Sequence, residues 1–149
     1  MRKDAGSYPL ERILDAAERA TLGDPAAIDL LNDADPAVRW WGVVSCLVRG
    51  DRGPRSEDAL RKALADPSWS VRVGAADAMA RLGKTEEALA VLIQALGQES
   101  DWVRVHALNV LDSLGEKARP ARDAIRKSRE RKQEYVDRLV EHALRALGE

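Results

Sequence analysis

Apolar positions recur along this chain in a phrase of fixed length that occurs four times. Each copy begins at a valine and ends at a glycine twelve residues later, and successive valines are 33, 32 and 33 residues apart. The copies are Val38–Gly50, Val71–Gly83, Val103–Gly115 and Val136–Gly148. The fourth residue after each valine is small or branched: Gly42, Ala75, Ala107 and Val140. A repeat of this period indicates a helical array in which each unit buries its apolar face by stacking on its neighbours.

Start and stop signals frame each phrase as a helix. Three residues before the valines stand Asp35, Ser68, Ser100 and Gln133. The first three are N-cap types, whose side-chain oxygen can accept a bond from an unpaired backbone N–H. The closing glycine falls where helices reverse in the left-handed conformation. The pattern predicts helices near residues 9–22, 25–31, 36–50, 56–65, 68–83, 85–97, 101–114, 118–129 and 132–147.

The first of these helices does not fit the repeat. Its apolar residues follow the 3.6-residue period and predict a face toward the next helices: Leu10, Ile13, Leu14, Ala17 and Ala20. We therefore expect this helix to cap the N-terminal end of the array. The prediction is one domain over residues 1–149, with a cap at 1–23 and repeats at 24–50, 51–83, 84–115 and 116–149.

Composition narrows the class of protein. Of the 149 residues, 45% are apolar and 33% are charged, which is typical of a globular domain. The formal net charge is −1, so the overall field attracts neither nucleic acid nor an anionic membrane. A single cysteine, Cys46, excludes an internal disulfide. No apolar run approaches the roughly 20 residues of a membrane span, and no signal peptide is expected after Met1 in this chain.

Three segments carry a family resemblance. They read Asp-Pro-Ala-Val-Arg at 35–39, Asp-Pro-Ser-Trp-Ser-Val-Arg at 66–72 and Asp-Trp-Val-Arg at 101–104. Over residues 24–149 the chain resembles HEAT repeats of the short bacterial type known from phycobilin-lyase-related proteins. The resemblance implies an all-α, right-handed α-solenoid of about four helix pairs behind an N-terminal capping helix. The fourth pair departs from the pattern, since Asp137 stands where the others have arginine, as expected of a terminal unit.

A narrower resemblance concerns residues 8–14, 35–42 and 109–121. These stretches look like the HEAT-repeat extension that follows the catalytic domain of some bacterial arylsulfatases. It implies the non-catalytic C-terminal part of a larger, exported sulfatase-like hydrolase, which supports the adjacent catalytic domain or engages a sulfated glycan. The sulfatase signature Cys-or-Ser-x-Pro-x-Arg has no match here, because Cys46 is followed by Leu47, Val48 and Arg49. A free-standing adaptor that binds a protein partner is the alternative.

The arginine that follows three of the valines predicts an inter-repeat ladder. Arg39, Arg72 and Arg104 lie beside the buried stripe, and each can pair with a nearby loop carboxylate: Asp35, Asp66 and Asp101. A ladder of this kind could instead bind an extended acidic ligand. The structural role is favoured, since a guanidinium beside loop carboxylates can form charge-assisted hydrogen bonds that join neighbouring repeats.

Four tryptophans are the candidate partner-binding residues: Trp40, Trp41, Trp69 and Trp102. On a helical projection Trp40 points away from the core, which favours a contact surface. For Trp41, Trp69 and Trp102 the preferred interpretation is packing against a neighbouring helix, because most large aromatic side chains are substantially buried.

A stripe of basic residues is the candidate anion-binding site. Arg119, Arg122, Arg126 and Arg129 recur at helical spacing, which could bind a polyanion such as a sulfated glycan or, less in keeping with the net charge, a nucleic acid. A solvated face is the alternative, and it is favoured.

No pattern of catalytic or cofactor-binding residues was found. His106 and His142 have no histidine or cysteine at metal-ligand spacing, and Cys46 falls on the predicted core face. The sequence therefore predicts a chain without catalytic residues, metal or cofactor, which acts as a scaffold.

Overall fold

A computed structural model describes residues 9–50, 53–128 and 134–148. Within these ranges the protein is helical and contains no strand, which confirms the all-α class. The chain divides into two compact units, one within residues 1–59 and the other within residues 60–149. The division of the sequence into four repeats stays a prediction, as does the handedness of the array.

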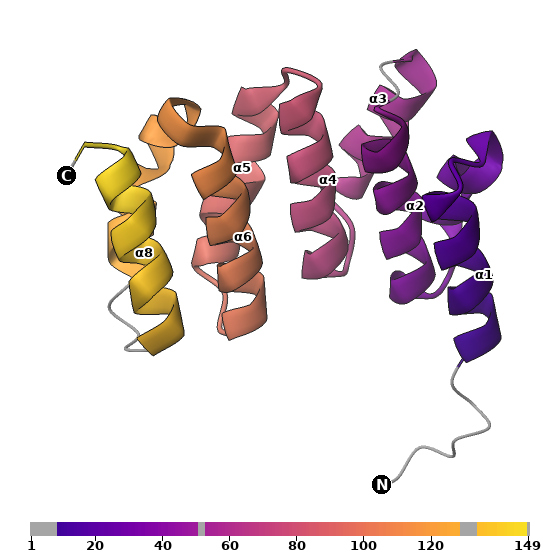
Figure 1. Ribbon diagram of the computed structural model, residues 1–149, viewed down its shortest axis with the longest axis horizontal. Helices are drawn as coiled ribbons and strands as arrows, with labels where there is room; N and C mark the ends of the chain where they lie inside the picture. The colour runs from indigo at the N-terminus through magenta and orange to yellow at the C-terminus, as the bar shows by residue number, and fades with distance from the viewer. Residues whose placement is uncertain (1–8, 51–52, 129–133, 149) are drawn as a thin grey trace, which may run out of the picture. The chain divides into compact units, whose positions relative to one another are not determined.

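The helices follow the predicted order (Figure 1). The first unit holds α1 (Leu10–Thr21), the 3₁₀-helix η2 (Pro25–Asn32) and α2 (Pro36–Arg49). Helix α3 (Pro54–Ala63) crosses the boundary between the units. The second unit continues with α4 (Trp69–Arg81), α5 (Thr85–Leu96), α6 (Asp101–Leu114), the 3₁₀-helix η3 (Gly115–Ala121), α7 (Arg122–Ser128) and α8 (Glu134–Ala146).

Two of the predicted α-helices are wholly or partly of the tighter 3₁₀ type. The segment after Asp24 is the 3₁₀-helix η2, and the helix predicted at 118–129 begins as η3 before becoming α7. Pro120 lies inside η3 and has no backbone N–H to donate, so an α-helix cannot run through it unbroken.

In the first unit, α2 packs against both α1 and η2. The side of α1 that is buried carries Ala16 and Ala20 rather than the leucines. Leu10 and Leu14 are 53% and 59% exposed, so the prediction that they face the core is wrong. A helix that approaches its neighbour through alanines sits close to it, and the bulkier side chains at the edge are then turned to solvent.

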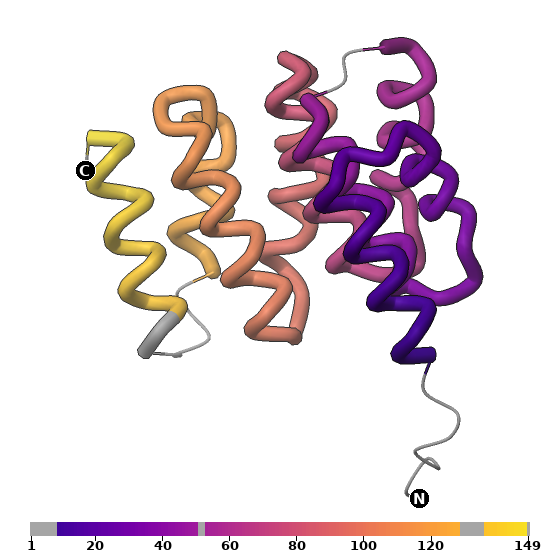
Figure 2. The backbone as a smooth tube through the Cα atoms, turned by 45° about the vertical axis from the view of Figure 1, so that its right-hand side comes forward, coloured from indigo at the N-terminus to yellow at the C-terminus, as the bar shows by residue number. Residues whose placement is uncertain are grey.

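In the second unit the helices form two layers, which can be followed from α4 to α8 in Figures 1 and 2. Helices α4, α6 and α8 lie side by side, and α6 contacts both of the others. Helices α5 and α7, with η3, make the second layer and pack against the first. The outward side of α4, α6 and α8 is therefore one continuous helical surface.

The repeated phrase supplies the core of both units. Val38, Val71 and Val136 are buried, as are all four residues at the fourth position after the valines, whereas Val103 is half-buried. The closing glycines have positive φ angles of 57°, 85°, 53° and 87° at Gly50, Gly83, Gly115 and Gly148. That conformation is costly for a residue with a Cβ, which explains the recurring glycine.

The predicted N-caps are only partly correct. The Asp35 carboxylate accepts a bond from the Ala37 N–H at 2.8 Å, as expected of a cap. Ser68 and Ser100 occupy cap positions but make no side-chain cap bond, so the prediction is wrong for both. The turn before α4 is instead held by a side chain two residues before Ser68: the Asp66 carboxylate accepts a hydrogen bond from the Ser68 N–H at 2.7 Å.

Candidate interaction surface

The outward side of α4, α6 and α8 is here called the α4–α6–α8 face. Side chains three, four or seven residues apart share one side of a helix. The exposed and half-exposed residues at this spacing are Ser70, Asp77 and Arg81 on α4, Trp102, His106, Asn109 and Ser113 on α6, and Arg138, Glu141, His142 and Arg145 on α8. The face is polar, carries charges of both signs, and includes one large aromatic side chain.

That aromatic residue is Trp102, in the first turn of α6. Its side chain is 82% exposed, so the prediction that it packs against a neighbouring helix is wrong. Exposed tryptophans are characteristic of binding surfaces, since the indole offers a large contact area at little cost in conformational entropy.

The other tryptophans are all half-buried. The ring of Trp69, in the first turn of α4, is covered by the Arg72 guanidinium, whose central carbon lies 3.8 Å from the ring centroid. Trp40 and Trp41 lie in α2, in the first unit. Trp40 is therefore less outward than its helical projection indicates, and the exposed indole is that of Trp102.

The arginines of the predicted ladder bond mainly to backbone carbonyls. Arg39 donates to the carbonyls of Asp33 and Ala34, both at 2.9 Å. Arg104 donates to those of Gln98 and Glu99, at 3.2 and 3.3 Å. In both cases the acceptors stand six and five residues before the arginine. The guanidinium thus ties down the turn that leads into its own helix.

The remaining ladder residues fit the same scheme. Arg72 donates to the Leu64 carbonyl at 3.0 Å and to the Gln94 side chain of α5 at 2.9 Å, so it joins α4 to α5 and to the turn that follows α3. Arg104 also donates to the Asp101 carboxylate and is only 2% exposed. These arginines are thereby structural residues, held by bonds within the protein.

Residues 24–112 match the family of HEAT repeats, and this stretch is more than half of the chain. The protein belongs to the HEAT-repeat family. The helical architecture of the second unit, with two layers of paired helices, is what a HEAT-like helical solenoid requires. HEAT repeats commonly act as scaffolds or interaction modules. No curated protein matches the chain. The match to HEAT repeats does not support the narrower resemblance to the HEAT-repeat extension of arylsulfatases.

A polar contact joins two neighbouring HEAT helices on the face. His142 Nδ1 of α8 lies 2.9 Å from the Asp112 carboxylate of α6. On α4, the Arg81 guanidinium pairs with Asp77 one turn earlier, at 2.9 Å. The Asp77 carboxylate raises the pKa of Arg81 and also acts on His106 of α6.

The predicted basic stripe is not a single helical stripe, because its residues lie in two different elements. Arg119 belongs to η3 and pairs with Glu116, whereas Arg122 and Arg126 belong to α7. Arg122 is half-buried and donates to the Leu147 carbonyl at the end of α8, at 2.9 Å. Arg126 pairs with Asp123. Arg129 lies outside the described residues.

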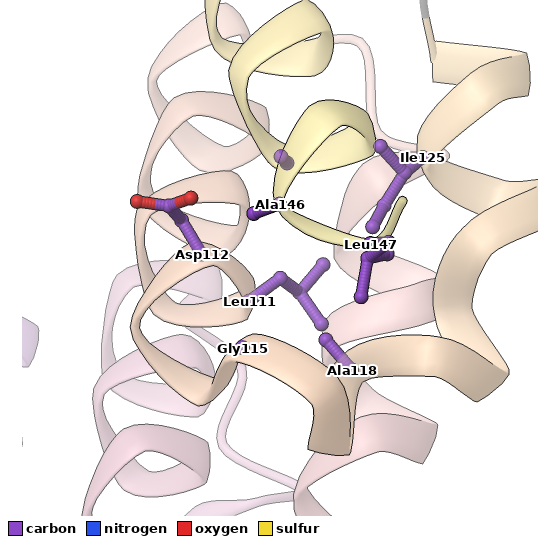
Figure 3. A pocket seen from close by; sticks show the side chains of 8 residues that line it. Leu111, Asp112, Gly115, Ala118, Ile125, Ala146 and Leu147 are labelled. Carbon is purple, nitrogen blue, oxygen red and sulfur yellow. The ribbon is translucent and has the colours of Figure 1, made fainter. Parts of the chain in front are cut away.

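The hollow at the C-terminal end of the second unit is a packing gap rather than a ligand site. It has no room for a water molecule. Leu111, Ile125 and Leu147 converge on it from α6, α7 and the end of α8, and the Asp112 carboxylate points away from it (Figure 3). Apolar walls without a converging polar group give a ligand nothing that would orient it.

Three further features of the described residues bear on the candidate sites. Cys46 is buried and forms no disulfide, in line with its predicted place on the core face of α2. No group of three potential ligand side chains that could hold a metal is found over the described ranges. None of the helices described is both long and apolar enough to cross a bilayer.

His106 is expected to make the HEAT repeats less stable in mild acid. Burial lowers its pKa below the usual 6.5, and the Asp77 carboxylate opposes this only in part. As pH falls below about 6.5, the unfolded chain therefore takes up a proton that the folded chain does not, and stability declines. Urea unfolding between pH 5 and 7.5 should show this slope in the native protein and a flatter one in His106→Gln. The exposed substitution Asn109→Gln on the same helix should leave the slope as it is, and equal slopes in all three proteins would contradict the assignment.

Proposed function

We propose that these HEAT repeats form a non-catalytic module that binds a protein partner through the α4–α6–α8 face. The observation that carries the proposal is Trp102, an exposed indole in the first turn of α6, in a family whose repeats commonly mediate protein interactions. Tryptophan is the residue type most enriched among those that dominate binding energy at protein interfaces.

The charges on the face favour a protein over a polyanion. Basic and acidic side chains alternate across it, with Arg138 and Arg145 beside Glu141 on α8 and Asp77 beside Arg81 on α4. A surface that binds polyanions needs a field of one sign to displace counterions from the ligand. Mixed charges instead suit a partner of mixed charge, and they set its orientation.

A photo-crosslinking experiment tests the proposal. A benzophenone amino acid is placed at Asn109, exposed on α6 and seven residues after Trp102, or at Ala90, exposed on α5 in the opposite layer. Irradiation of cells that express the full chain should give a discrete protein adduct from position 109 and none from position 90. Adducts from both positions, or from neither, would count against the face.

Trp102→Ala should abolish that adduct without destabilising the fold. Because the indole is 82% exposed, its removal is expected to change the free energy of unfolding by no more than about 0.5 kcal/mol. Trp69→Ala is the matched control, since it removes a half-buried indole and the ring under Arg72. It should destabilise the protein by about 1–3 kcal/mol in urea unfolding and spare the adduct at concentrations where the protein is folded.

The narrower hypothesis of a sulfatase parent stays a prediction. It requires a native polypeptide several times longer than this chain, with Cys-or-Ser-x-Pro-x-Arg before the HEAT repeats. The mass and N-terminal sequence of the native protein test it directly. A sulfated-glycan ligand would bind with a steep salt dependence that Arg126→Ala reduces, whereas the protein-binding proposal expects no effect of that substitution.

A further inference from the structure

The first turn of α4 contains a complete tryptophan–arginine stack. Arg72 stands three residues after Trp69, so both side chains lie on the same side of the helix. The guanidinium is held over the ring at 3.8 Å while it donates to the Leu64 carbonyl and the Gln94 side chain. A cation over an indole face is attracted by the negative potential of the ring.

The first turn of α6 has the same two residue types in a different register. Arg104 stands only two residues after Trp102, so it points to another side of the helix, and it is buried on bonds to Gln98, Glu99 and Asp101. The residues three and four after Trp102 are Val105 and His106. Burial lowers the pKa of His106, so that this imidazole is uncharged near pH 7. No cation from α6 therefore covers the Trp102 ring.

The surroundings of Trp102 in the chain are acidic. Glu99 is exposed and stands three residues before it, and the Asp101 carboxylate next to it is 40% exposed even though it accepts from Arg104. The Arg104 guanidinium is 2% exposed and paired with Asp101, so the net negative charge beside Trp102 in the chain comes from Glu99. An exposed indole beside carboxylates is complementary to a cation with a flat, weakly hydrated face.

We propose that Trp102 is the docking site for an arginine side chain of the protein partner. The guanidinium stacks on the indole as Arg72 does on Trp69, and the Glu99 carboxylate attracts its charge. Arginine fits better than lysine because its planar group can stack on the ring and donate to a carboxylate at the same time. This inference rests on the proposed function, since it assigns the chemistry of the partner at the α4–α6–α8 face.

NMR titration with short peptides tests the proposal. The full chain, ¹⁵N-labelled, is titrated with acetyl-Gly-Arg-Gly-amide or with the same peptide containing citrulline, an uncharged analogue of arginine. The four indole N–H signals are assigned by single substitution of each tryptophan with leucine. The arginine peptide should shift the Trp102 signal saturably and leave that of Trp69 unchanged, because Arg72 already occupies its ring. The citrulline peptide should bind at least about fivefold more weakly.

Two variants sharpen the test. Glu99→Gln should weaken binding of the arginine peptide by about threefold while the Trp102 signal remains as a reporter. Val105→Arg places an internal arginine three residues after Trp102, as in α4, and should compete with the peptide. If that half-buried substitution unfolds the protein, Glu99→Gln and the citrulline peptide still decide the question.

Equal binding of the arginine and citrulline peptides would overturn the inference, as would unchanged binding in Glu99→Gln. Failure here is distinguishable from failure of the proposed function. A crosslinked protein that is captured at position 109 and lost in Trp102→Ala, together with no response to the arginine peptide, would retain the binding face and reject the arginine.

Discussion

Gly42→Ala is expected to destabilise the first unit by about 3 kcal/mol, the upper part of the range for overpacking. A Cβ at this position would lie 2.7 Å from the Leu31 backbone nitrogen and 2.9 Å from its Cγ. The nitrogen belongs to η2 and cannot rotate away, so α2 and η2 must separate. Intrinsic helix propensity alone predicts the opposite sign, because alanine within a helix is favoured over glycine by about 1 kcal/mol.

Urea unfolding with tryptophan fluorescence measures the effect, and Trp40 and Trp41 report on the same unit. Gly97→Ala is the matched control, since its added Cβ meets nothing closer than the Gln94 carbonyl oxygen at 3.4 Å and its φ is −81°. That substitution should be neutral or stabilising by up to about 1 kcal/mol. A Gly42→Ala protein as stable as the native one would mean that α2 and η2 do not approach as closely as described.

Arg104→Ala is expected to cost about 3 kcal/mol in the second unit. The substitution removes a side chain that is 2% exposed and leaves the carbonyls of Gln98 and Glu99, in the turn between α5 and α6, without its bonds. Arg104→Met fills much of the same volume but donates nothing. It should recover the packing part of the loss, about half, so the loss that remains in Arg104→Met relative to the native protein measures the hydrogen bonds.

Arg119→Ala provides the control for Arg104. Arg119 also pairs with a carboxylate three residues before it, Glu116, but its side chain is 63% exposed. An ion pair in that position contributes no more than about 1 kcal/mol, so the substitution should be nearly neutral. Similar losses for Arg104→Ala and Arg119→Ala in urea unfolding would show that burial of the Arg104 guanidinium does not matter.

The sequence by itself determined those features that depend on neighbours along the chain. The period of the valine phrase predicted the helices, and the closing glycines predicted the left-handed turns that Gly50 and Gly83 adopt. The Asp-Pro step at Asp35 and Pro36 likewise predicted the start of α2. Helix period, capping and turn conformation are local properties, so residue type and spacing are enough to fix them.

Only the tertiary structure decided which side chains at the edge of each helix are buried. The bonds of Arg39 to carbonyls before its helix, and the exposure of Leu10 and Leu14, depend on how closely two helices approach. Trp69 and Trp102 occupy the same turn of successive phrase helices, one residue apart in register. Because of this shift of one residue, the Trp69 indole lies under the Arg72 guanidinium, whereas the Trp102 indole lies in solvent. Moving a side chain by one residue rotates it by about 100° around the helix axis. The neighbouring helices then determine whether the side chain is buried or exposed in its new direction.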